Sequence, residues 1–201
     1  MMLSRINPFV LPPTQADAWE MDGQGWCLQV QQLVSPNFGK RPEQMAISML
    51  VIHNISLPVG QFGNNYIEEL FQNTLNCDAH TSFASLRDLR VSSHFLILRD
   101  GRVQQFVSVL DRAWHAGLSH FQGRDGCNDF SIGIELEGCD SQPFEDAQYM
   151  SLLKLSQALL RHSPIEHIVG HEEIAPGRKT DPGPYFDWAR FQQALGAWRI
   201  T

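Results

Sequence analysis

The run Met45-Ala46-Ile47-Ser48-Met49-Leu50-Val51-Ile52 is a short apolar stretch with β-branched residues, and His53 follows it directly. Such a run is typical of a strand buried in a sheet, although its length also permits a segment of buried helix. The loop Leu57-Pro58-Val59-Gly60-Gln61-Phe62-Gly63 comes soon afterwards and contains the residues that end regular structure. The sequence therefore predicts a central strand with a histidine at its C-terminal end.

The segments further along the chain predict a mixed sheet with helices around it. Residues 93–98 and 103–109 alternate in polarity, and the Asp-Gly pair between them is a strong hairpin signal. Phe130 to Leu136 predicts another strand, on which Glu135 faces away from the isoleucines. Strands mixed with helices favour the α/β (α+β mixed) class, a central mixed β-sheet flanked by helices. The remaining expected elements are helices at 65–75, 143–161 and 187–195, and a short strand at 165–169.

The composition favours a globular protein of one domain, residues 1–201, and excludes some partners. Apolar residues make up 43% of the chain and charged residues 18%. The net charge of −7 disfavours nucleic acid, because phosphate binding needs clustered lysine and arginine, and it disfavours an anionic membrane surface. No stretch reaches the roughly 18 apolar residues of a membrane span.

The N-terminus and the cysteines predict a cytoplasmic protein. Residues 1–17 contain one arginine but no continuous apolar core, so no secretory signal is expected there. The cysteines are widely spaced and form no CxxC pair, which is typical of reduced thiols in a cytoplasm and gives zinc held by thiolates weak support. They are Cys27, Cys77, Cys127 and Cys139.

The segment Gly170-His171-Glu172-Glu173-Ile174-Ala175-Pro176-Gly177-Arg178-Lys179-Thr180-Asp181-Pro182-Gly183 is rich in proline and glycine and predicts an irregular loop. His171 follows a short apolar run, as His53 does, so two neighbouring strands would present both imidazoles at one edge of the sheet. Asp181 could return to the same point. Two histidines and one carboxylate form a catalytic zinc arrangement. The same set also suits non-haem iron(II), so the spacing leaves the metal open.

Hydrolysis at such a site needs a group that moves protons and a positive charge for the developing oxyanion. Glu135, on the polar side of its strand, suits the first task, and Glu137 faces the same side and competes for it. Glu135 could equally be a structural or solvated carboxylate. Lys179 suits the second task, and its alternative interpretation is an exposed loop lysine.

Five segments, in the same order along the chain, together resemble one family of amidases. The segments are Val51-Ile52-His53-Asn54-Ile55-Ser56-Leu57-Pro58, Arg90-Val91-Ser92-Ser93-His94-Phe95, Arg112-Ala113-Trp114-His115-Ala116-Gly117, Cys127 through Gly138, and Gly170 through Pro184. They are similar to the AmpD-type enzymes, the cytoplasmic 1,6-anhydro-N-acetylmuramyl-L-alanine amidases of bacterial cell-wall recycling. The resemblance runs from about residue 26 to about residue 188.

This resemblance implies the fold of phage lysozyme-type amidases and peptidoglycan recognition proteins. It implies one catalytic zinc ion on His53, His171 and Asp181. Glu135 would orient or deprotonate the water, and Lys179 would stabilise the oxyanion. The substrate would be an anhydro-muropeptide, cut between the lactyl group of anhydro-N-acetylmuramic acid and L-alanine. The resemblance makes an influence on β-lactamase induction an expectation, and no obligate protein partner is evident.

The resemblance also implies two substrate-binding residues and shows one departure. Arg90 resembles an arginine that engages the peptide stem, and Asn54 resembles a residue that binds near the first ligand. The family carries a second substrate-binding arginine directly before the cysteine of the CNDFSIGIE run, where this chain has Gly126. Arg124 lies close to that position and is a candidate to replace the missing arginine.

Other residues and other functions stay open at this level. His94 and His115 lie in the resembling segments, and we expect the first to support a ligand and the second to contact substrate. Trp114 packs either on a sugar ring or in the core. The alternative functions are an amidase acting on intact peptidoglycan, a non-catalytic muropeptide-binding protein, and an iron oxygenase that only the ligand types support.

Overall fold

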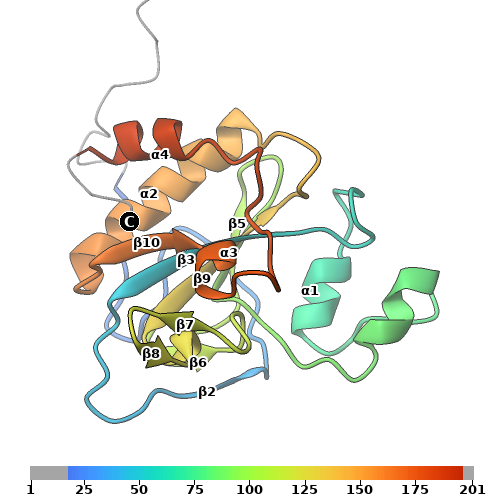
Figure 1. The fold of residues 1–201 in the computed structure, drawn as a ribbon, viewed down its shortest axis with the longest axis horizontal. Helices are drawn as coiled ribbons and strands as arrows, with labels where there is room; N and C mark the ends of the chain where they lie inside the picture. Colours follow the sequence, from blue (N-terminus) through green and yellow to red (C-terminus); the bar gives the residue numbers. More distant parts are fainter. Residues whose placement is uncertain (1–17, 197–201) are drawn as a thin grey trace, which may run out of the picture.

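The computed structural model describes residues 18–196, and the stretch 1–17, where no secretory signal is expected, lies outside them. The main sheet of the described residues has six strands in the order β1-β5-β4-β9-β3-β10 (Figure 1). At its centre, β3 (Met49–Ile55) runs parallel to both β9 (Ser131–Glu137) and β10 (His167–Gly170). The other strands are β4 (Phe95–Ile97), parallel to β9, β5 (Val103–Gln105), antiparallel to β4, and β1 (Gln31–Gln32). This confirms the expected mixed sheet.

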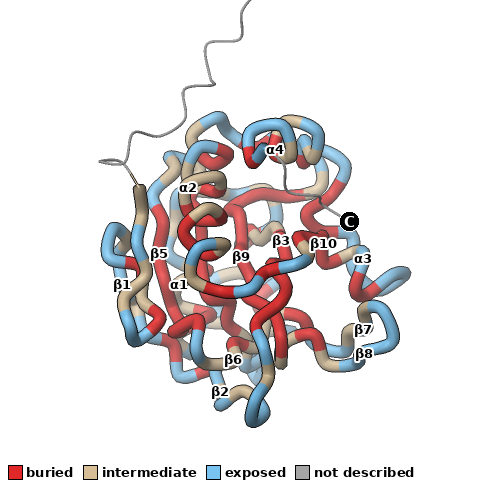
Figure 2. Tube along the Cα trace, turned by 90° about the vertical axis from the view of Figure 1, so that its left-hand side faces the viewer, coloured by how far each residue is buried: buried red, intermediate tan, exposed pale blue. Residues whose placement is uncertain are grey.

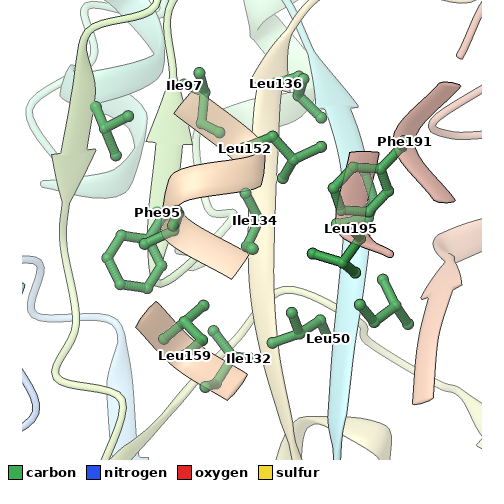
Figure 3. Packing of buried hydrophobic residues seen from close by; sticks show 14 of the residues in the cluster. Leu50, Phe95, Ile97, Ile132, Ile134, Leu136, Leu152, Leu159, Phe191 and Leu195 are labelled. Atoms are coloured by element: carbon green, nitrogen blue, oxygen red, sulfur yellow. The ribbon is translucent and has the colours of Figure 1, made fainter. Parts of the chain in front are cut away.

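Two helices, α2 (Asp146–His162) and α4 (Trp188–Leu195), cover one face of the sheet (Figure 1). The side chains of β9 alternate between the two faces, and every second one joins the core beneath these helices. Figure 3 shows this layer, in which apolar residues of the sheet and of both helices interdigitate. Its members include Leu50, Phe95, Ile132, Ile134, Leu136, Leu152, Leu159, Phe191 and Leu195.

Shorter elements and loops surround the rest of the sheet. Its strand β9 is buried along its whole length, and β3 is buried up to His53 (Figure 2). None of the helices in the described part is both long and apolar enough to cross a membrane. The shorter elements are α1 (Tyr66–Phe71), α3 (His171–Ile174), the pair β2 (Phe38–Lys40) and β6 (Asp111–Ala113), the pair β7 (His120–Phe121) and β8 (Arg124–Asp125), and the 3-10 helices Thr81–Leu86 and Cys127–Asp129.

The central strand differs from its expected limits. It begins at Met49 and continues to Ile55, so His53 lies inside the strand and not at its end. The reason is that β9 pairs with β3 along its whole length, up to Ile55 opposite Glu137. The loop after β10 differs as well, because its first four residues form the helical turn α3. The Glu173 side chain accepts a hydrogen bond from the backbone N–H of Gly170 at 2.8 Å and caps that turn.

The expected hairpin and helices are confirmed, although most are shorter than expected. Gly101, in the turn between β4 and β5, has a φ of +85°, and a Cβ there would lie 2.8 Å from the carbonyl oxygen of Ala147. The turn therefore requires glycine. The helix expected at 65–75 covers only Tyr66–Phe71, since Asn73 adopts a φ of +61°, which ends a right-handed helix.

Candidate metal centre

The pairing of three parallel strands brings the predicted site residues together. His53 on β3 lies directly opposite Glu135 on β9. On the other side of β3, Gly170 pairs with Ile52, so His171 follows the end of β10 beside His53. Because side chains alternate along a strand, His53 and Glu135 point away from the face that α2 and α4 cover. The site is thus built on the second face of the sheet.

Three candidate ligand atoms form a compact triangle in this site. His53 Nδ1, His171 Nδ1 and Asp181 Oδ2 lie 3.0 Å from one another along all three edges. All three residues are buried, and the set could hold a metal ion. Ligand atoms about 2.0–2.1 Å from a tetrahedral zinc ion lie roughly 3.3 Å apart, close to the observed edges. The donors therefore fit zinc, with one coordination position left over.

The protonation states of these residues also suit a metal. Burial, with the neighbouring His171 adding to it, lowers the pKa of His53 to about 4, so its imidazole is neutral at pH 7. Burial alone would raise the pKa of Asp181, but its contacts with the imidazoles of His171 and His53 outweigh burial and hold the pKa below the usual range. A neutral imidazole and an ionised carboxylate are the forms that bind metal ions.

The far sides of both imidazoles contact one short segment, His115-Ala116. His53 Nε2 lies 2.9 Å from His115 Nδ1, and His171 Nε2 lies 3.1 Å from the carbonyl oxygen of Ala116. His94 does not reach the ligands: its Nδ1 accepts from the backbone N–H of Gly133 at 3.0 Å. The support of a ligand that we expected from His94 therefore comes from His115. The histidine in the Arg112–Gly117 segment was the available signal, but its spacing gave no hint of this contact.

The structure distinguishes between Glu135 and Glu137, the two candidates for the group that moves protons. Glu137 accepts hydrogen bonds from the backbone N–H groups of Gly63, at 2.6 Å, and Arg99, at 3.0 Å, so both its oxygens have structural partners. Glu135 Oε1 lies 3.9 Å from His53 Nδ1, and its Oε2 is buried without any partner. Burial, with the charge of Asp181 adding to it, raises the pKa of Glu135 well above its usual value. An unpartnered carboxylate oxygen beside three ligands is placed to contact a water molecule.

Lys179 is exposed, but its charge reaches the site. Its charge contributes a lowering of the pKa of Glu135 and of His53, the smallest of the effects that act on each. No described residue in 18–196 accepts a hydrogen bond from this ammonium or pairs with it. The backbone of the loop is fixed, because Lys179 N donates to Ala175 O at 3.0 Å and Glu172 N donates to Asp181 O at 2.9 Å.

The two residues expected to bind substrate are placed differently. Asn54 Nδ2 donates to Asp140 Oδ1 at 2.8 Å and to the carbonyl oxygen of Pro182 at 3.0 Å, so it holds the loop beside Asp181. Arg90 is exposed, and its guanidinium donates to the carbonyl oxygens of Arg87 and Leu89 within its own loop. The structure does not bring Arg90 into the metal centre.

Gly126 stands where the resembling family carries an arginine. It lines a groove with a volume of about 630 Å³, which Arg178 also lines. Gly126 has a φ of +70°, in the left-handed region that favours glycine. The guanidinium of Arg124 lies 3.7 Å from the ring centroid of Phe130, in cation–π contact. Arg124 is therefore held against the protein, and it does not line this groove.

Comparisons with known proteins agree with this geometry. The family model for N-acetylmuramoyl-L-alanine amidase, Amidase_2, matches residues 43–184. The chain is 52% identical over 175 residues to the 1,6-anhydro-N-acetylmuramyl-L-alanine amidase AmpD of Haemophilus influenzae, covering 86% of this chain and 95% of that protein. It is 51% identical over 171 residues to AmpD of Escherichia coli, covering 84% and 93%.

Solved structures give the same result. The crystal structure of a selenomethionine AmpD derivative superposes with a TM-score of 0.84 at 50% identity, covering 90% of this chain and 99% of that one. The E. coli amidase AmiD, in complex with the substrate anhydro-N-acetylmuramic acid-L-Ala-D-γ-Glu-L-Lys, gives a TM-score of 0.56 at 30% identity, covering 87% and 65%. The chain belongs to the N-acetylmuramoyl-L-alanine amidase family, as an enzyme of the AmpD type.

Proposed function

We propose that the protein is a zinc-dependent amidase that cuts anhydro-muropeptides between 1,6-anhydro-N-acetylmuramic acid and L-alanine. It acts as one amidase domain in cytoplasmic cell-wall recycling, the setting that its resemblance to AmpD implies. The observation that carries the proposal is the buried triangle of His53, His171 and Asp181 with the unpartnered Oε2 of Glu135 beside it. Family membership supports the substrate class, since the AmpD relatives carry that activity in their names.

The chemistry follows from the donors and charges around the triangle. A zinc ion bound there would polarise the amide carbonyl and lower the pKa of a bound water to about 7. Glu135 accepts a proton from the attacking water and delivers it to the amine of alanine, which leaves. Its raised pKa suits this exchange, because a group that both takes and gives a proton works best near the operating pH.

Positive charge is needed where the carbonyl oxygen becomes an oxyanion. The charge of the Lys179 ammonium acts on the pKa of Glu135, and no residue in the described range 18–196 pairs with it, so it is available to the substrate. We assign it this role. Substrate contacts by Arg90 and by Asn54 remain proposals, and the hydrogen bonds of Asn54 favour a role in holding the loop of Asp181.

One assay tests the proposal. The purified protein is incubated with anhydro-muropeptide and, separately, with intact peptidoglycan sacculi, with and without a chelator, and peptide release is followed by mass. We expect release from anhydro-muropeptide that stops when zinc is removed and returns when zinc is added back. Release that persists after verified zinc removal contradicts the mechanism. Preference for sacculi moves the function to a peptidoglycan amidase, and binding without release makes the protein a muropeptide-binding module.

A further inference from the structure

A chain of hydrogen bonds with a fixed direction runs from the backbone to His53. It begins at the carbonyl oxygen of Cys127, which can only accept. Ser131 Oγ lies 2.6 Å from that oxygen and donates its one hydrogen to it. Towards His115 Nε2, 3.2 Å away, Ser131 Oγ can therefore only accept. His115 must carry its hydrogen on Nε2.

The same logic continues through His115. A neutral imidazole with a hydrogen on Nε2 has a lone pair on Nδ1, and this atom faces His53 Nε2 at 2.9 Å. His53 then donates from Nε2 and keeps the lone pair on Nδ1, the atom that faces His171 and Asp181. A metal at the triangle requires this same form of His53. The tautomer that the hydrogen-bond chain from Cys127 imposes on His53 is therefore the tautomer that metal binding requires.

The surroundings hold the His115 ring in this position. The ring lies over Gly133, where a Cβ would come within 2.5 Å of it, and it meets the His53 ring edge-on at an interplanar angle of 87°. The Asn128 side chain accepts hydrogen bonds from the backbone N–H groups of His115, at 3.2 Å, and Ala116, at 2.9 Å. A larger residue at position 133 would displace the ring.

We propose that His115 is a positioning residue that fixes the tautomer and the ring orientation of His53, with Ser131 setting the direction. The adjacent carbonyl of Ala116 holds His171 in the same tautomer, so one segment prepares both imidazoles. Groups of this kind typically change metal affinity by about 10–100-fold. The inference rests on the proposed zinc site, and its test does not depend on amide hydrolysis.

The experiment measures zinc affinity by competition with a chromophoric chelator in the wild type, His115→Phe, His115→Asn and the control His120→Phe. His120 is exposed, and its ring pairs with Asp125 and with none of the three candidate ligands. We expect His115→Phe to weaken zinc binding by about 10–100-fold. The shorter amide of His115→Asn places an acceptor near the Nδ1 position and recovers part of the affinity. His120→Phe leaves the affinity unchanged.

Two further measurements separate positioning from general support of the fold. Nitrogen-15 shifts of the imidazoles show which nitrogen of His53 is protonated, and we expect a mixed population in His115→Phe. Thermal unfolding of the metal-free variants reports the fold alone. A folded His115→Phe that binds zinc as the wild type does overturns the inference. If that variant does not fold, Ser131→Ala decides, and unchanged zinc affinity there overturns it equally.

The proposed function and the positioning role of His115 can fail independently of each other. If the wild type binds zinc through the three ligands but releases no peptide, the proposed function fails and the positioning role stands. If the wild type hydrolyses its substrate and His115→Phe keeps full zinc affinity, only the positioning role fails.

Discussion

At the scale of single residues, the ligand Asp181 combines two tasks. Its side chain is an anion 3.0 Å from Nδ1 of His53 and of His171, and its backbone carbonyl accepts a hydrogen bond from the N–H of Glu172 at the start of α3. We predict that Asp181→Ala lowers zinc affinity more than the roughly 10–100-fold expected for a supporting residue, because it removes a ligand itself. Metal analysis after dialysis measures this loss. The exposed Asp125→Ala is the matched control, and equal zinc content in both variants contradicts the assignment.

Glu135 provides a second residue-level prediction. Glu135→Gln keeps the shape of the side chain but cannot take a proton from water, so we expect turnover to fall by about 10²–10⁴-fold. Zinc content stays unchanged, because Glu135 is not one of the three ligands. Steady-state kinetics and metal analysis on the same sample check both parts. Near-normal turnover would remove Glu135 from the mechanism, and the occupied oxygens of Glu137 make it a poor replacement.

The same variant predicts a pH dependence of stability in the metal-free protein. Burial raises the pKa of folded Glu135 above its value of 4.5 in an unfolded chain. Between these two pKa values the folded state binds more protons than the unfolded state, so its stability falls as pH rises. Glutamine does not titrate. We therefore expect Glu135→Gln to raise the thermal midpoint, by more at pH 8 than at pH 5, and a gap that closes with rising pH contradicts this.

Individual residues show how much of the candidate site could be predicted from the sequence. His53, His171 and Asp181 could be grouped because each stands beside an apolar run or a loop signal, and the resemblance supplied the rest. Glu135 and Glu137 could not be separated, since they share a face of one strand and differ only in which backbone N–H groups approach them. The contact of His115 with His53 joins residues 62 apart, and local patterns carry no information on it.

At the scale of elements, α2 and the metal centre lie on opposite faces of the sheet. Leu152 is fully buried between α2 and β9, and truncation there leaves a cavity. We predict that Leu152→Ala lowers the free energy of unfolding by about 2–5 kcal/mol, measured by urea denaturation. The half-exposed Met150→Ala, on the same helix, changes it little. Zinc affinity of folded Leu152→Ala remains that of the wild type, and a matching loss of affinity would show that the two faces are coupled.

The elements were easier to predict in kind than in length. The Asp-Gly pair identified the hairpin of β4 and β5 because its turn demands a particular backbone conformation. The end of β3 was misjudged, because the polar residues His53 and Asn54 interrupt the apolar pattern while pairing with β9 continues through them. In the same way, α3 forms in a segment rich in proline and glycine, since both prolines of that segment lie beyond its single turn.

At the scale of the whole molecule, a bound zinc ion and the fold stabilise each other. A ligand that binds only the folded state at 100 times its dissociation constant adds about 2.7 kcal/mol to the free energy of unfolding. We predict that chelation lowers the thermal midpoint, that re-addition of zinc restores it, and that the Asp181→Ala variant shows neither change. Calorimetry with and without chelator measures this. An identical midpoint in both conditions would mean that zinc does not bind the folded triangle.

The spacing of the three ligands along the chain has a consequence for the unfolded protein. His53 is separated from His171 by 118 positions and from Asp181 by 128. An ion held by all three is a reversible cross-link that closes a loop over more than half of the polypeptide. Closing a loop of about 100 residues costs an unfolded chain roughly 4.7 kcal/mol of entropy, so the three ligands assemble, and zinc binds, in the folded state. Supply of zinc would then govern how long the chain survives exposure to proteases, apart from any effect on catalysis.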